Sequence, residues 1–500
     1  MLYLELLRLA APEAILVVTV LCTLALGVSA RASTRLLSFI AILGLLAAAI
    51  AVCLLPENAT LFNGMLVVSP LNSLFKVICL ALSGFTVFQA EREIEGPPPA
   101  AHHAEYTALI LLATLGLLLL VGSEELLMIF IGLELTGLSF YVLTAFDRAD
   151  IRAAEAGLKY FLFGSTASAF TLFGLSLIYG VCGSTGLGVI VDSLTGTNLS
   201  SQPLLAVAII MTLAGFGFKV AAAPFHLWAP DVYQAAPIST AALIASSSKV
   251  ASFVVLGKIL LMGFAPVVGN AGWHTVAAGW SPVIATLAAI SIVVGNLVAL
   301  VQTNLRRLLA YSAVAHAGYG LLGIVAATPE GFAATLFYST VYGVTLVGAF
   351  GIVGWVRRAT GGDNISNFRA LGRRSPWLSS FLAVFLLSLA GLPPLGGFFG
   401  KFYLFSAALD AGQNNGLLWL VVIALVGSFI SLYYYLIVLK AVFVDEPLAL
   451  PAEEVPGPAG VAVTANQGGD SLIFGLLALA VLLLGLLPDT LLARIVGALT

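Results

Sequence analysis

The side chains of this sequence that could do chemistry are a few ionisable groups inside long apolar stretches. Lys219 ends an apolar run, and two prolines, Pro224 and Pro230, follow it closely. A lysine at the centre of a bilayer costs on the order of 3 kcal/mol, and a nearby proline breaks the helix and releases backbone groups that need partners. A broken membrane helix with an ionisable group at the break is typical of ion transporters.

A second interrupted stretch, residues 389–402, has the same character, because it contains two prolines and Lys401. Glu134 is the one acidic residue, out of 24 Asp and Glu, that falls at the middle of an apolar interval. Opposite charges lower each other's cost of burial, so we expect Glu134 to pair with Lys159 on the next helix. The alternative is a Glu134 carboxyl that stays protonated in an apolar core.

Lys249 follows three consecutive serines, a polar group in mid-interval that could hold water. Histidine titrates near neutral pH, so His226 and His316 suit a relay between lysines, although a lone histidine could equally be a core residue with satisfied hydrogen bonds. The candidate residues for proton translocation are Glu134, Lys159, Lys219, His226, Lys249, His316 and Lys401.

Lysine and arginine occupy different places in this sequence. Every lysine lies within an apolar interval, whereas the arginines lie at interval ends or in connections. Arginine stays charged, whereas lysine changes its pKa readily when buried, so this partition favours titratable cations inside the membrane. We expect Lys440 and Lys258 to reach the membrane interface by snorkelling, and we leave Lys76 open between interface and interior.

The composition indicates a polytopic, all-α membrane protein, because 60% of the 500 residues are apolar, 9% are charged and the mean hydropathy is +1.08. We count about fourteen membrane-length intervals. No basic patch indicates nucleic acid, no histidine has further ligands at metal-binding spacing, and no P-loop, dinucleotide fingerprint or iron–sulfur cysteine set is present. The sequence therefore favours ion movement without redox chemistry on this chain.

The order of the intervals indicates an internal repeat. Glu134 and His316 are separated by the same number of residues as Lys219 and Lys401. Each copy holds five intervals, so the second must enter the membrane from the opposite side, as in inverted-repeat transporters. The predicted divisions are 1–103 (spans 1–3), 104–264 (first repeat), 281–444 (second repeat) and 471–492 (span 14). Arginines follow the odd-numbered intervals, which predicts that both termini lie outside the cytoplasm, in the periplasm of a Gram-negative cell.

Two motifs, FKVAAAPFHLWAPDVYQAAP (218–237) and GLPPLGGFFGKFYLF (391–405), resemble the antiporter-like membrane subunits of respiratory complex I, the bacterial NADH–quinone oxidoreductase. NLRRLLAYSAVAHAGY (304–319) also fits that family. The resemblance covers nearly the whole chain. Within the family, the WAPDVY wording and the lysine at 401 favour the N type over its sister subunits.

This resemblance implies a proton-translocating subunit in the bacterial inner membrane, with the seven candidates as its functional residues. It implies other membrane-arm subunits as partners, and it places NADH, flavin, iron–sulfur clusters and quinone on other subunits, with no cofactor on this chain. Two alternatives stay open. One is a subunit of a multisubunit cation/proton antiporter that uses the same lysines. The other is a membrane scaffold whose polar residues only hold helices together.

Overall fold

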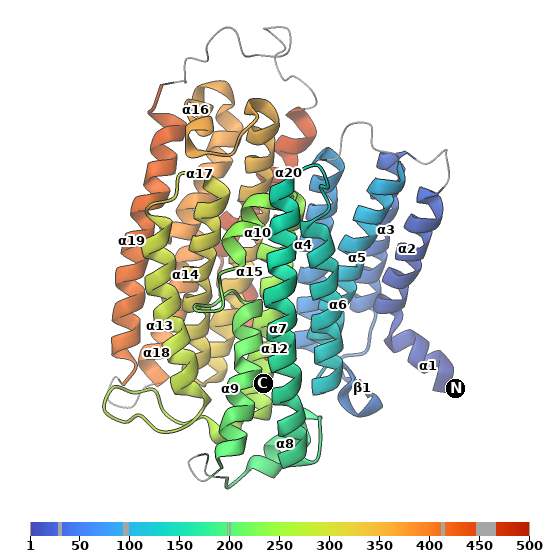
Figure 1. Ribbon diagram of the computed structural model, residues 1–500, viewed down its shortest axis with the longest axis vertical. Coiled ribbons are helices and arrows are strands. Elements are labelled where there is room, and N and C mark those ends of the chain that lie inside the picture. Colours follow the sequence, from blue (N-terminus) through green and yellow to red (C-terminus); the bar gives the residue numbers. More distant parts are fainter. Residues whose placement is uncertain are drawn as a thin grey trace.

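The computed structural model describes residues 2–28, 33–93, 100–197, 199, 202–411, 416–446 and 467–499. Most of these residues form long, roughly parallel helices that pack side by side (Figure 1). A small antiparallel hairpin, in which β1 (Ala59–Leu61) pairs with β2 (Leu66–Val68), lies at one end of the bundle. The helical membrane class predicted from the sequence is confirmed, with this hairpin as an addition.

Within the described residues, ten helical segments are long and apolar enough to cross a membrane, or eleven if the bent pair α20–α21 counts as one. The ten are α3 (Thr34–Cys53), α4 (Pro70–Glu93), α5 (Ala100–Gly122), α6 (Leu126–Thr144), α7 (Ile151–Cys182), the run Ile238–Gly263, α13 (Trp280–Ala299), α14 (Leu305–Val325), α15 (Pro329–Thr360) and α19 (Leu418–Phe443). Three apolar helices are shorter: α2 (Ala11–Gly27), α9 (Pro203–Lys219) and α17 (Pro376–Ala390).

The other helices connect these segments or complete them. They are α1 (Leu2–Leu9), α8 (Leu187–Leu194), α10 (Ala229–Ala235), α16 (Leu371–Arg374), α18 (Gly396–Ala411), α20 (Gln467–Leu486) and α21 (Asp489–Leu499). The run Ile238–Gly263 itself consists of α11 (Ile238–Leu243), the π-helical turn η3 (Ile244–Ser248), α12 (Lys249–Lys258) and the π-helical turn η4 (Ile259–Gly263).

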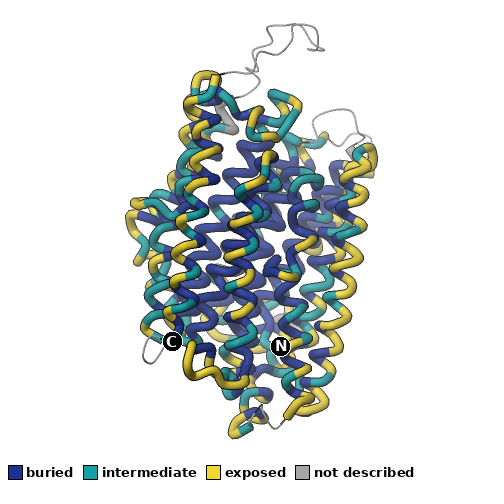
Figure 2. Tube along the Cα trace, turned by 60° about the vertical axis from the view of Figure 1, so that its left-hand side comes forward, coloured by how far each residue is buried: buried dark blue, intermediate teal, exposed yellow. Residues whose placement is uncertain are grey.

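The centre of the bundle is formed by the run Ile238–Gly263, α14 and α15, whose apolar windows are 100%, 94% and 94% buried. Helices α3, α7 and α19 form the outside, with 39%, 33% and 39% of their windows buried. Figure 2 shows the same division, with buried residues along the middle of the bundle and exposed residues on the outer helices. Ionisable residues on the central helices therefore have little access to lipid or water.

Two helices are interrupted where the sequence predicts it. Helix α9 ends at Lys219, the Ala223–Pro224 peptide bond is cis, and α10 starts at Ala229. The freed backbone groups have partners, because the Ala223 amide donates to Ser291 Oγ at 2.8 Å. Membrane helices tolerate such breaks when neighbouring groups replace the lost backbone hydrogen bonds. The second break separates α17 from α18 and contains the cis bond Pro393–Pro394.

Glycines allow close packing of the first-half helices. A Cβ atom added to Gly215 of α9 would lie 1.6 Å from Thr171 Oγ1 of α7, and one added to Gly116 of α5 would lie 2.4 Å from Thr136 Oγ1 of α6. Small residues let membrane helices approach closely, since van der Waals contact is a main source of their association. The positions of α6, α7 and α9, which hold Glu134, Lys159 and Lys219, depend on these contacts.

Candidate functional site

Lys219 is the last residue of α9 and lies at the first break. Its ammonium nitrogen is 5.3 Å from the centre of the Phe140 ring on α6, a cation–π contact. Glu134 lies on the same helix α6, and its carboxylate is the acidic group that acts electrostatically on Lys219. Glu134 also accepts a short hydrogen bond from Ser168 Oγ of α7. The contact with Phe140 therefore places Lys219 of α9 beside the helix that carries Glu134.

The predicted pairing of Glu134 with Lys159 is wrong. Lys159 instead forms ion pairs with Glu155, one turn earlier on α7, at 2.7 Å and with Asp231 of α10 at 2.9 Å. Asp231 also binds Arg307 of α14 at 2.8 Å. The break after α9 brings α10 beside α7, so the acid that meets Lys159 lies after the break and not on α6.

Lys249 is 3% exposed and follows the π-helical turn η3. Its ammonium donates to the carbonyl oxygen of Ala313 on α14 at 2.5 Å and lies 5.0 Å from the ring centre of Tyr342 on α15. A cation with a carbonyl and an aromatic ring as neighbours keeps some stabilisation after losing water. Lys249 thus faces both central helices, α14 and α15.

His316 lies on α14 between the two buried lysines, and both Lys249 and Lys401 act on it electrostatically. Its Nδ1 is 2.5 Å from the Tyr338 hydroxyl and its Nε2 is 3.2 Å from the Tyr435 hydroxyl. A neutral imidazole has one donor and one acceptor nitrogen, and a tyrosine hydroxyl can complement either. His316 can therefore take a proton at one nitrogen and release it from the other.

Lys401 lies on α18, and its side chain reaches back to the end of α17. Its ammonium donates to the carbonyl oxygens of Leu389 and Ala390, each at 3.0 Å, and to Ser428 Oγ at 2.9 Å. The C-terminal end of a helix carries partial negative charge, which stabilises a cation there. The ammonium is also 5.1 Å from the ring centre of Tyr319 on α14.

The two lysines at the breaks lie on opposite sides of them along the chain, because Lys219 precedes its break and Lys401 follows its own. Even so, each lysine lies at the C-terminal end of the half-helix before the break, Lys219 by its position in α9 and Lys401 by its bonds to α17. Lys219 and Lys401 are separated by the same number of residues as Glu134 and His316, but the two lysines do not occupy equivalent positions in their broken helices.

A continuous series of buried polar and aromatic groups joins α12 to α18. The Tyr342 ring lies 5.0 Å from Lys249 and its centre 5.0 Å from that of His316, and the Tyr319 ring centre is 5.6 Å from that of His316. We call this series the central relay: Lys249, Tyr342, His316, Tyr319 and Lys401. The relay crosses α12, α15, α14 and α18 within the best-buried part of the bundle.

His226 lies in the first break and is 8% exposed. Its ring centre is 6.4 Å from that of Tyr311, and among the described residues its Nδ1 has no hydrogen-bond partner. Tyr311 in turn contacts Arg307, which binds Asp231. The structure thus places His226 on the side of the Asp231–Arg307 pair, whereas the sequence grouped it with the relay lysines.

Sequence reasoning missed Asp231 and the tyrosines that surround His316. Tyr338 and Tyr342 are four residues apart on α15, so they share one helix face. Tyrosines at this spacing in an apolar interval could have been noted as buried hydroxyls that need partners. Asp231 follows Pro230 directly after the break, and the sequence alone does not show which helix it will face.

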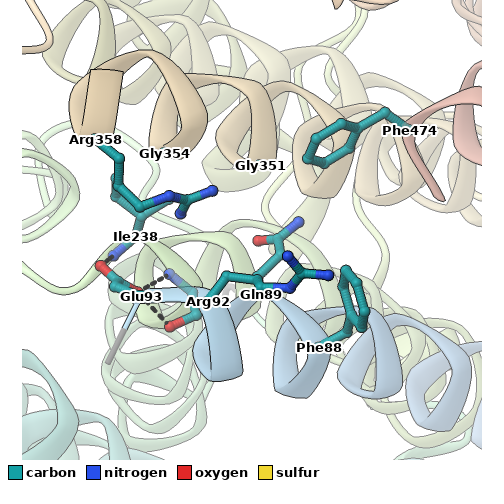
Figure 3. A pocket seen from close by; sticks show the side chains of 10 residues that line it. Phe88, Gln89, Arg92, Glu93, Ile238, Gly351, Gly354, Arg358 and Phe474 are labelled. Atoms are coloured by element: carbon teal, nitrogen blue, oxygen red, sulfur yellow. Dashed lines mark hydrogen bonds between the residues drawn. The ribbon is translucent and has the colours of Figure 1, made fainter. Parts of the chain in front are cut away.

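The arginine-rich end of the bundle has a large cleft of about 1280 Å³. Its lining includes the charged side chains of Asp147, Arg148 and Arg357, together with Tyr141 of α6. Beside it lies a cavity of about 20 Å³, which is lined by α4, α11, α15 and Phe474 of α20 (Figure 3). This cavity is large enough for one water molecule. Glu93 accepts hydrogen bonds there from the amides of Ile238 at 2.5 Å and Ser239 at 3.0 Å, and so fixes the start of α11.

Two broken membrane helices, with a line of buried titratable groups that reaches the second break, are the features of an antiporter-like membrane protein. A family model described as NADH:quinone oxidoreductase/Mrp antiporter, TM, matches residues 123–431. NADH-quinone oxidoreductase subunit N 2 of Acidobacterium capsulatum is 47% identical over 479 residues, which cover 92% of this chain and 94% of that protein. The chain therefore belongs to the family of NADH:quinone oxidoreductase and Mrp antiporter membrane proteins, and the resemblance read from its motifs is confirmed.

Solved structures agree with this assignment. A chain of respiratory complex I from Thermus thermophilus with bound aureothin superimposes with a TM-score of 0.77 at 33% identity, over 96% of this chain and 98% of that one. A chain of the Mrp complex from Dietzia sp. superimposes with a TM-score of 0.80 over 99% of this chain and 97% of that one. The second likeness, at 23% identity, shows the shared fold alone.

Proposed function

We propose that this chain is a proton-translocating membrane-arm subunit of an NADH–quinone oxidoreductase, of the N type. The observation that carries the proposal is the central relay, which links Lys249 on α12 to Lys401 at the second break through the buried middle of the bundle. In a family whose relatives include subunit N of this oxidoreductase, such a line of proton-binding groups has a direct use. The chain contributes to a redox-driven translocase as a membrane subunit, with other membrane-arm subunits as its partners.

The proposed architecture has fourteen crossings. The short apolar helices α2, α9 and α17 complete the crossings suggested by the longer segments, and α9 and α17 continue through their breaks into α10 and α18. Residues 104–264 and 281–444 form two inverted five-helix repeats, after three spans in 1–103 and before the last in 471–492. Support comes from the two cis-proline breaks, each with an ammonium group at the end of the half-helix before it.

In the proposed mechanism, each named group has one task. Glu134 lies on α6, the helix whose Phe140 contacts Lys219, so a change in the position or charge of Glu134 changes the electrostatic field at Lys219. Lys159 forms an ion pair with Asp231 and contributes in this way to the electrostatic field at the start of α10. His226 exchanges protons with water in the first break, and Lys249 receives the proton from the Lys219 side.

From Lys249 the proton passes to His316 and then to Lys401. Two positive charges near one another in a low-dielectric interior repel strongly, so the arrival of a new proton on Lys249 drives a proton already on His316 onward to Lys401. The tyrosine hydroxyls keep the imidazole oriented between steps. Redox chemistry with NADH, flavin, iron–sulfur clusters and quinone takes place on other subunits and supplies the energy, and no cofactor is needed on this chain.

We place the arginine-rich connections in the cytoplasm and both chain ends on the periplasmic side of a bacterial inner membrane. The cleft beside Arg148 and Arg357 would then open towards the cytoplasm and give water access to the first half of the chain. This orientation makes uptake from the cytoplasm and release through Lys401 the working direction.

The test is Lys249→Ala in the complete complex, with Lys440→Ala as the matched control. The Lys440 side chain is 68% exposed and lies outside the relay. Membranes are prepared, assembly is checked, and NADH–quinone reductase activity is measured together with proton translocation. We expect Lys249→Ala to lower proton translocation by about tenfold or more, as loss of a proton-transfer group does, and Lys440→Ala to leave it unchanged. Wild-type pumping by an assembled Lys249→Ala complex would overturn the proposal in favour of a scaffold.

A cation/proton antiporter is the second candidate, because the fold is shared with a chain of the Mrp complex. The two candidates differ in what drives proton movement. Sodium-dependent proton exchange without NADH would favour the antiporter, whereas strict dependence on electron transfer favours the oxidoreductase subunit.

A further inference from the structure

A second group of buried charges lies apart from the central relay. We call it the lateral charge cluster: Glu13 of α2, Lys76 of α4, Lys258 of α12 and Glu124 between α5 and α6. The expectation that Lys258 snorkels to the interface is wrong, since Lys258 is 1% exposed. Lys76, which the sequence left open, is also 1% exposed.

The contacts in the lateral charge cluster are close. Lys76 Nζ lies 2.6 Å from Glu13 Oε1, with side-chain exposures of 2% and 9%. The other carboxylate oxygen, Glu13 Oε2, is buried and has no hydrogen-bond partner among the described residues. An unpartnered carboxylate oxygen in a dry site is costly unless it binds water or a proton.

Lys258 occupies the other half of the lateral charge cluster. It donates to the Val121 carbonyl oxygen at 2.8 Å and to Asn72 Oδ1, and it lies 3.8 Å from Glu124 Oε1. Lys76 acts on Lys258 electrostatically, as one positive charge on another. The two ammonium groups therefore repel each other, and each is stabilised by its own carboxylate, Lys76 by Glu13 and Lys258 by Glu124.

The lateral charge cluster leads to one face of the molecule. The Glu124 side chain is 27% exposed, and its backbone amide binds Gly64 beside the β1–β2 hairpin. In Figure 1 this hairpin lies at the lower end of the bundle, whereas α16 with Arg373 and Arg374 lies at the upper end. The charges thus run from the buried Glu13–Lys76 pair to the face opposite the arginines.

Helix α12 joins the lateral charge cluster to the relay. Lys249 and Lys258 are its first and last residues, about 13 Å apart along the axis. Lys249 contacts α14 and α15, and Lys258 contacts α4 and the end of α5. The π-helical turns η3 and η4 border α12 on both sides. Such turns shift backbone carbonyls out of regular bonding and often mark functional sites.

We propose that the lateral charge cluster is a proton-exchange site that connects the first half of the chain to water on the face opposite the arginine-rich loops. Lys258 Nζ gives a proton to the Glu124 carboxylate, which releases it to solvent. The Glu13 carboxylate shares a proton with Lys76, and the position of this proton determines whether Lys76 carries a positive charge near Lys258. Intramembrane ionisable groups are functional by default because their burial is expensive. The inference rests on the proposed function, since it requires protons to move through this chain.

The test uses Glu13→Gln and Lys258→Met in the complete complex. The matched control is Gln89→Leu on α4, the helix of Lys76, which removes a buried bond of 2.8 Å to the Val347 carbonyl oxygen of α15 but no titratable group. Protons moved per NADH oxidised are measured in sealed vesicles between pH 6 and 9, after assembly is checked. We expect both test variants to lower this ratio at least about twofold and to shift its pH profile, and Gln89→Leu to do neither. Glu13→Asp should restore part of the ratio.

If assembled Glu13→Gln and Lys258→Met complexes keep the wild-type number of protons moved per NADH and the wild-type pH profile, the inference is overturned. The lateral charge cluster would then have a structural role only. If Glu13→Gln does not assemble, the double variant Glu13→Leu with Lys76→Met replaces the pair by apolar groups, an exchange that folded proteins often accept. A wild-type ratio in that variant would overturn the inference as well. Loss of pumping in Lys249→Ala alongside normal pumping in these variants would keep the proposed function, whereas normal pumping in all of them would remove both.

Discussion

Lys401→Arg separates the charge of Lys401 from its ability to release a proton. Arginine keeps the positive charge and can still donate to the Leu389 and Ala390 carbonyl oxygens that hold Lys401. Its reference pKa is about 2 or more pKa units above that of lysine, which corresponds to a proton release about 100-fold less favourable. If Lys401 only needs to be positive, this variant should work. If it must pass a proton, the variant should fail.

The size of the guanidinium adds a second effect. Lys401 is 4% exposed, and a Cβ atom on Gly391 would already lie 3.0 Å from its Cδ. Additional atoms in such a packed site cost about 1–3 kcal/mol of stability. Assembly must therefore be measured first, and Lys401→Met, which has a similar volume to lysine and no charge, supplies the comparison.

The assay follows proton uptake into inverted vesicles with a pH-sensitive dye while NADH oxidation is recorded. We expect assembled Lys401→Arg complexes to pump at about 1% of the wild-type rate, the 100-fold loss that corresponds to the difference of about 2 units between the reference pKa values. Lys440→Arg, at a largely exposed lysine, should pump normally. Wild-type pumping by Lys401→Arg would refute the reasoning, because it would show that a fixed charge is sufficient at this position.

Three further predictions follow from other contacts. Tyr338→Phe removes the hydroxyl that lies 2.5 Å from His316 Nδ1, a buried hydrogen bond worth about 1–3 kcal/mol. We expect this variant to assemble and to pump about tenfold or more slowly. A change in assembly with no change in pumping would contradict the role of His316 in the relay. Asp231→Asn weakens the ion pairs of Asp231 with Lys159 at 2.9 Å and with Arg307 at 2.8 Å. Because all three side chains are partly exposed, we expect only a small fall in the thermal stability of the solubilised complex. Gly215→Val places atoms where a threonine of α7 already lies and should reduce the amount of assembled complex, with Gly180→Val, at an open position, as its control.

The sequence was most informative about which ionisable residues lie inside apolar segments and least informative about which residues contact one another. Lys219, Lys249, His316 and Lys401 were recognisable as candidates because an ionisable residue in an apolar interval is rare and expensive. The breaks were also predictable, since proline cannot continue a helix. The family assignment rested on these same motifs and is confirmed.

Contacts between helices could not be predicted from the sequence in the same way. The sequence paired Glu134 with Lys159 because their helices are consecutive, whereas the structure pairs Lys159 with Asp231, which lies beyond a break. The expectation that Lys258 reaches the interface was wrong for the same reason. Nothing in the segment around Lys258 indicates that Asn72 and the end of α5 will lie beside it.

What the sequence by itself determined was the membrane class, the helical segments, the two breaks and the set of ionisable groups inside. Each of these depends on local chemistry: hydropathy over one crossing, the missing amide of proline, and the cost of one charge in an apolar segment. Only the tertiary structure decided that the Tyr342 ring lies between Lys249 and His316 and that Glu13 reaches Lys76. Helix packing in a membrane depends on side-chain shape and glycine positions on several helices at once, and the energy of a buried charge depends on the partner that this packing brings to it.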